Sequence, residues 1–189
     1  MVLVSIIIGL GIGHILLGVG GIIDRSSGHG PRLKLSVAHA AWLGTVFVWM
    51  VLFWWWEYRF AELQAEWTVQ LYFFLITYAV ALFLMAAVLV PRSWDGVDDL
   101  SVYLIERRAW FYSLYFLVNV IDLFDSYLKG GWLYLTDLGP FNWAFSAATI
   151  PICWVGLRSR DPTHHAVVAL VSLVWQISVG PVNLPSLGL

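Results

Sequence analysis

Residues 101–128 read SVYLIERRAWFYSLYFLVNVIDLFDSYL, and this stretch decides both the fold class and the question of function. It is apolar over more than the length that crosses a lipid bilayer as a helix, about 20 residues. Yet it carries two carboxyl groups near its end, Asp122 and Asp125. Ionisable residues inside a membrane are energetically costly and mark functional sites by default. The stretch therefore predicts a membrane helix that contributes to an acidic functional site.

The composition of the whole chain is that of a membrane protein. Of its 189 residues, 60% are hydrophobic and 12% are charged, whereas soluble domains are roughly 45 to 50% apolar. The net charge is −2 and there is no basic run, so we expect no binding to nucleic acid. The single cysteine, Cys153, excludes an intramolecular disulfide and a thiolate iron–sulfur cluster. The length fits one transmembrane domain, residues 1–189.

Six apolar segments are separated by short connectors that hold most of the glycine, proline and charged residues. We therefore predict an all-α, polytopic bundle of six transmembrane helices. The first segment lacks the basic region of a secretory signal, so we expect it to be retained as a span. Asp161 followed by Pro162 is a typical helix start, and Asp98, Asp99 and Ser101 are candidate caps of the fourth helix. The predicted spans are Val2–Ile23, Leu35–Trp56, Trp67–Val90, Ser101–Leu128, Phe141–Leu157 and Pro162–Val179.

The distribution of positive charge predicts the orientation of the bundle. Eight of the ten lysine and arginine residues lie in or beside the first, third and fifth connectors, and only Arg59 and Lys129 lie in the second and fourth. Positive residues concentrate on the cytoplasmic side, so both termini are predicted to lie outside. Most tryptophans then fall near a membrane interface, Trp42 near the inner one and residues 54–56 near the outer one, as aromatic belts require.

Polar residues of the fourth segment recur at intervals of three and four, which places them on one helix face. The face includes Arg108, Tyr115, Asn119 and Asp122, and Asp125 lies one turn further on. The helix rises about 21 Å between Arg108 and Asp122, so Asp122 is expected in the outer third of the hydrocarbon layer. In the alternative interpretation this carboxyl reaches water or pairs with a neighbouring group.

The fifth and sixth segments carry polar residues at the same spacing, including Ser146, Thr149 and Gln176. We expect these faces and that of the fourth segment to meet. Together they would form an ion path in which acids attract the ion, amides supply hydrogen bonds and Arg108 sets the inner electrostatic gate. Acidic residues outnumber basic ones at the predicted outer end, which favours a cation over an anion. Plain helix packing is the alternative for such residues.

Two histidines lie in the first and second segments. His14 and His39 are each interpreted either as neutral imidazoles bonded to a neighbouring helix or as proton-relay or ligand residues. A haem held by both needs them at one depth, yet they are expected to differ by roughly 8 Å. We therefore predict no cofactor, with haem as the alternative. His164 and His165 lack a third ligand of suitable spacing, so no metal site is predicted.

Glycines in the first segment share one helix face, namely Gly11, Gly18 and Gly21, and Gly9-x-x-x-Gly13 lies on an adjacent one. Glycine lets two helices approach closely, so this segment is expected to be a packing helix or an oligomer contact. No phosphate-loop, serine-hydrolase or zincin motif occurs in the sequence. We accordingly predict no catalytic residues.

The runs Tyr103-Leu-Ile-Glu-Arg-Arg-Ala-Trp-Phe and Val120-Ile-Asp-Leu-Phe-Asp, with the tryptophan-rich Phe53-Trp-Trp-Trp-Glu, resemble a group of small bacterial polytopic membrane proteins. The resemblance covers most of the chain. It implies a bacterial cytoplasmic membrane and carries no activity with it.

Three classes of function follow from the sequence. The leading hypothesis is a small channel or carrier for protons, cations or small polar solutes, with a homo-oligomer as a plausible assembly. The second is a non-catalytic membrane subunit or assembly protein, in which the glycine and polar faces serve association. A membrane redox protein is the third, and it would require a cofactor because no nucleophile–base pair occurs in the sequence.

Overall fold

The structure, a computed structural model, describes residues 2–27, 33–63, 68–137 and 139–179, and its regular elements there are α-helices. Apart from them, one isolated bridge joins Lys34 to Asp99. The predicted all-α class is confirmed, and the helix bounds agree with the predicted segments to within three residues except at the ends of the second and fourth helices, which extend to Leu63 and Asp137. The helices are α1 (Val2–Ser26), α2 (Val37–Leu63), α3 (Val69–Leu89), α4 (Leu100–Asp137), α5 (Gly139–Arg158) and α6 (Pro162–Val179).

Three helices in the described part of the chain are long and apolar enough to cross a membrane, which indicates a membrane protein. They are α1, α2 over Val37–Glu57 and α3. The other three helices contain more charged and polar residues, among them Arg108 and Asp122 of α4. The charged and polar residues of α4, α5 and α6 form the polar faces that the sequence predicts.

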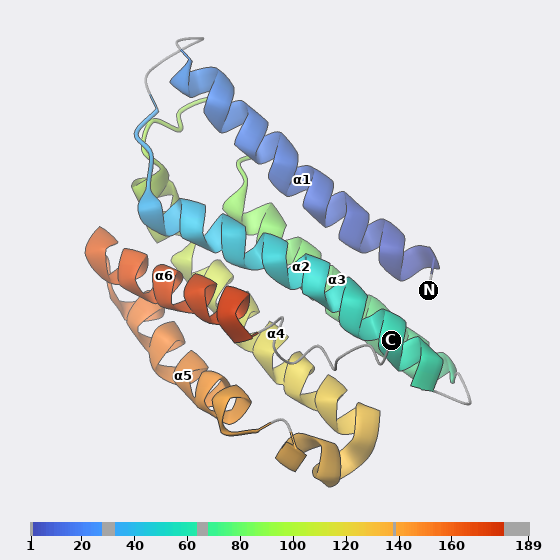
Figure 1. Cartoon of the computed structure of the whole chain (residues 1–189). Coiled ribbons are helices and arrows are strands. Elements are labelled where there is room, and N and C mark those ends of the chain that lie inside the picture. The colour runs from blue at the N-terminus through green and yellow to red at the C-terminus, as the bar shows by residue number, and fades with distance from the viewer. Residues whose placement is uncertain (1, 28–32, 64–67, 138, 180–189) are drawn as a thin grey trace.

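Successive helices alternate in direction (Figure 1). The C-terminal ends of α1, α3 and α5 therefore lie at the same end of the bundle as the N-terminal ends of α2, α4 and α6. α1 packs against α3, α2 packs against α6, and α4 lies against both α3 and α5. Because α2 also contacts α1, α3 and α4, it is the central helix of the bundle.

Two carboxylates start helices as the sequence predicts. Asp99 accepts a hydrogen bond from the backbone N–H of Ser101 at 2.7 Å, and the Lys34 ammonium 2.8 Å from its carboxylate lowers the pKa of Asp99. Asp161 accepts from the N–H of Thr163 at 2.8 Å, which lowers the pKa of Asp161. Both bonds satisfy N–H groups that have no partner within the helix.

The predicted end of the fourth span at Leu128 coincides with a break in α4 rather than with its end. Gly130 and Gly131 have non-helical backbone angles, and helical structure resumes beyond them to Asp137. Gly131 has φ of 64°, a left-handed conformation that glycine adopts without steric cost. The long straight part of α4 therefore ends at Lys129.

The core is built from aromatic side chains of α2 and α4. Trp42 is fully buried, with its ring centroid 4.8 Å from that of Phe111 and 4.9 Å from that of Tyr115 in edge-to-face geometry. Such pairs are favoured by the quadrupoles of the rings. Trp42 is thus enclosed by α4 and does not lie on the outer surface of the bundle, whereas Trp54 and Trp55 of the same helix are exposed.

The glycine face of α1 is a packing face, as one of the two interpretations predicts. A Cβ atom at Gly18 would lie 2.7 Å from the side chain of Val90, whereas at Gly20 no described atom lies within 4 Å of such a Cβ. The close approach of α1 to the end of α3 therefore depends on glycine at position 18.

We predict that Gly18→Val destabilises the protein by about 1–3 kcal/mol, because the added methyl groups overpack the contact with Val90. Gly20→Val is the matched control, since it has the same change in volume and helix propensity with space around it. Unfolding of the purified protein in mixed micelles with increasing denaturant measures both. Equal loss in the two variants would contradict the close contact.

Candidate functional site

The polar face of α4 meets α5 and α6, as the sequence predicts. Thr149 of α5 donates to the side-chain oxygen of Asn119 at 3.1 Å. Tyr115 donates to Ser172 of α6 at 3.4 Å, and all four residues are buried. Gln176 is also buried on α6, whereas Ser146 is half-buried and donates to the backbone carbonyl of Asn142 at 3.1 Å.

Toward the predicted inner end, the polar face is bonded to the ends of α5 and α6. The hydroxyl of Tyr112 lies 2.8 Å from Nδ1 of His165, a buried residue. Arg108 donates from Nε to the carbonyl of Leu157 at 3.2 Å and from Nη1 to the carbonyl of Ile105 at 2.8 Å. Arg108 therefore binds carbonyls, including one in the last turn of α5 that lacks an intrahelical partner.

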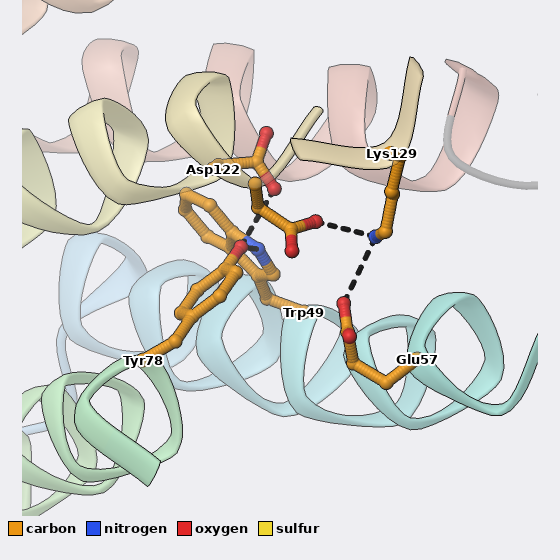
Figure 2. A network of polar contacts seen from close by, with 6 residues as sticks. Trp49, Glu57, Tyr78, Asp122 and Lys129 are labelled. Carbon is orange, nitrogen blue, oxygen red and sulfur yellow. Dashed lines mark hydrogen bonds and ion pairs between the residues drawn. The ribbon is translucent and has the colours of Figure 1, made fainter. Parts of the chain in front are cut away.

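At the other end of the face, Asp122 is paired. It accepts a hydrogen bond of 2.6 Å from the hydroxyl of Tyr78 in α3, which in turn accepts one of 3.2 Å from the indole N–H of Trp49 in α2. Figure 2 shows these three side chains in contact from three different helices. The expected intramembrane carboxyl thus has a specific donor, which is the pairing alternative raised by the sequence.

Asp125 lies in a buried ionic cluster with Glu57 and Lys129. The Lys129 ammonium lies 2.9 Å from Oε1 of Glu57 and also contacts Asp125, four residues before it on α4 (Figure 2). The side chain of Glu57 is 1% exposed and that of Lys129 10%. The cluster joins α2 to the end of the straight part of α4.

Two carboxylate oxygens of this cluster can each accept a further hydrogen bond. Oε2 of Glu57 and Oδ1 of Asp125 are buried and have no hydrogen-bond partner within the described residues. With Asp122 one turn away, three carboxyl groups gather near one ammonium group. Buried carboxylates are costly unless they are paired or gain a positive charge, so the arrangement favours uptake of a proton.

Glu57 follows the second predicted segment and is one of the acidic residues expected at the outer end, and the structure buries it against Lys129. The signal that was available is the Asp125-x-x-x-Lys129 spacing, which brings the two side chains together on one helix face. Tyr78 and Trp49 carried no comparable signal, because their roles arise only when α2 and α3 pack beside α4.

The two candidate ligand histidines contact α3 at different places. His14 lies beside Phe83, with ring centroids 6.3 Å apart. His39 is buried, and its Nε2 lies 2.7 Å from the carbonyl oxygen of Leu89. That nitrogen therefore donates to the carbonyl, which corresponds to the interpretation of a neutral imidazole bonded to a neighbouring helix. No group of three or more metal-ligating side chains occurs among the residues that the structure describes.

We predict that Lys129→Met destabilises the protein by about 3–5 kcal/mol, because it leaves buried carboxylates without their cation. Adding Glu57→Gln and Asp125→Asn to this variant restores part of the loss. Lys34→Met is the control, since that exposed lysine pairs with Asp99 at the surface and contributes about 1 kcal/mol or less. Denaturant-induced unfolding in micelles measures all of them, and a Lys129→Met protein as stable as the parent would contradict the ionic cluster.

Comparison of the chain with protein-family models, with curated proteins and with solved structures found no match.

Proposed function

We propose that this chain is a small multi-pass protein of a bacterial cytoplasmic membrane that conducts or carries protons or small cations. In this proposal all six helices cross the bilayer and both termini lie outside. The alternation of helix direction (Figure 1) supports the topology, because it gathers the connectors that hold most lysine and arginine residues at one end. The bacterial location rests on the resemblance noted in the sequence.

The observation that carries the proposal is the buried cluster of Glu57, Asp125 and Lys129 beside Asp122. A structural ion pair needs one acid for each base, whereas this cluster has three acids near one base. One oxygen each of Glu57 and Asp125 has no partner in the described part of the chain, and these oxygens supply places for a further positive charge. Ionisable side chains of this kind inside membranes mark proton and ion pathways.

Polar groups continue from the cluster toward the inner end of the bundle. Asn119 with Thr149, Tyr115 with Ser172, and Tyr112 with His165 follow one another along α4. Hydroxyl and imidazole groups both donate and accept protons. Because these groups are buried and bonded to one another, they favour a proton as cargo over a larger polar solute.

We predict that Asp125→Asn and Asp122→Asn each lower proton flux by about tenfold or more, since proton-transfer groups typically contribute that much to rate. The measurement uses the full chain in proteoliposomes that contain a pH-sensitive dye, under an imposed membrane potential. Glu106→Gln is the control, because its side chain is 68% exposed at the other end of α4. Flux equal to that of empty vesicles, or unchanged in both acidic-site variants, overturns the proposal.

A second candidate function is assembly with another copy of the chain, and the open face of α1 favours it. Within the described residues, nothing lies within 4 Å of a Cβ built at Gly9 or Gly13. Such a Gly-x-x-x-Gly face lets another membrane helix approach closely. It is separate from the face of α1 that packs against α3.

We expect the double variant Gly9→Leu, Gly13→Leu to shift a detergent-solubilised oligomer to the monomer, because leucine side chains hold the two helices apart. Light scattering coupled to gel filtration gives the mass of the protein component. Val171→Leu, an exposed position on α6, serves as the control. A parent chain that is monomeric at every concentration contradicts this candidate.

A further inference from the structure

A cavity of about 430 Å³ lies between α1 and α2, closed at one end by Leu100 at the start of α4. Its volume is in the range of small-molecule sites, roughly 300–1,000 Å³. Ile15, Leu43 and Leu100 are buried parts of its lining, whereas Leu16 and Leu35 are exposed at its rim. The exposed leucines show that the cavity opens on an apolar outer surface of the bundle, where a membrane lipid has access.

His39 gives this apolar cavity a polar feature. It lines the cavity and is 1% exposed, and its Nε2 is already committed to the carbonyl of Leu89 at 2.7 Å. In a neutral imidazole with a donating Nε2, the other nitrogen is a hydrogen-bond acceptor. Nδ1 is buried and has no partner in the part of the chain that the structure describes. A buried acceptor without a donor is costly, so a ligand that supplies one is favoured once a small shift of the lining side chains opens Nδ1 to the cavity.

The position of His39 in α2 fits the head of a lipid. It is the third residue of the helix, while Leu43 and Phe47 continue the lining by one and two further turns. A polar head at His39 would therefore lie near a membrane interface, with its chain directed along α2 into the bilayer. Ser36 adds a hydroxyl group to the lining at the same end.

We propose that this cavity binds a neutral lipid alcohol, whose hydroxyl group donates a hydrogen bond to Nδ1 of His39 and whose hydrocarbon chain lies between α1 and α2. The class follows from the lining. Among the described residues that form the cavity none is charged, so an anionic or cationic head finds no counter-charge there. A pure hydrocarbon would fill the space but leave Nδ1 without a donor. This site is separate from the acidic cluster and does not depend on the proposed transport.

The probe is radiolabelled farnesol, an isoprenoid alcohol, added to the detergent-solubilised full chain. We expect saturable binding, and competition by farnesyl methyl ether about tenfold or more weaker than by unlabelled farnesol, because the ether has no donor for His39. His39→Phe is expected to weaken binding of farnesol by a similar factor. If farnesol and its methyl ether compete equally well, the proposal is overturned. That result shows that the cavity binds the hydrocarbon chain and makes no hydrogen bond with the hydroxyl group.

Two further variants test the location without disturbing the buried histidine. Ala40 is exposed and lines the cavity, so Ala40→Trp fills the space from the rim and is expected to abolish binding. Ile177→Trp places the same bulk on an exposed position of α6 and is expected to leave binding unchanged. Farnesol binding to Ala40→Trp with the parent's affinity places the ligand elsewhere and overturns the proposal, even if His39→Phe fails to fold.

Discussion

The ion pairs between Lys129 and two carboxylates on different helices are the interaction on which the end of the bundle beside the Gly130–Gly131 break depends. Glu57 comes from the central helix and Asp125 from α4, and neither side chain is exposed to solvent by more than a few per cent. Water cannot stabilise these charges, so the ammonium group must do so. Because Lys129 directly precedes the Gly130–Gly131 break, α4 ends its straight course where this bond forms.

The same constraint explains why polar residues in the rest of the bundle are found in pairs. A hydroxyl or amide in an apolar interior is costly without a partner, so Asn119 binds Thr149 and Tyr115 binds Ser172. Each bond joins α4 to one of the two helices that are less apolar than α1 and α3. These helices therefore associate through matched polar faces, whereas α1 approaches α3 through glycine.

Much of the fold could be predicted from the sequence, because its determinants are local. Apolar segments, the Asp161–Pro162 helix start and the Asp99 cap each depend on residues within one or two helical turns. The spacing of three and four also identified the face of α4 that meets α5 and α6. The orientation of a face can be read in this way whenever one helix carries several polar residues.

Which helix lies opposite a given face is a property of the tertiary arrangement, and it could not be derived from spacing. Glu57 follows the second predicted span at the end expected to lie outside, and nothing in its spacing indicates that it is buried against Lys129 of α4. Tyr78 could not be identified in this way, since α3 is apolar nearly throughout and its two tyrosines do not define a polar face. Its bond to Asp122 exists only because α3 packs beside α4.

The polar groups of the bundle are of two kinds, those with hydrogen-bond partners within the described residues and those that keep a buried atom without one. Asn119, Thr149 and Ser172 have hydrogen-bond partners within the protein, and these bonds hold helices together. Within the described residues, Glu57, Asp125 and His39 each retain a buried atom without a partner after forming their own contacts, and so do His14 and Trp42. A buried polar atom without a partner lowers the stability of the protein. In the proposed functions, the two acids receive a positive charge and His39 receives a donor hydroxyl from outside the chain.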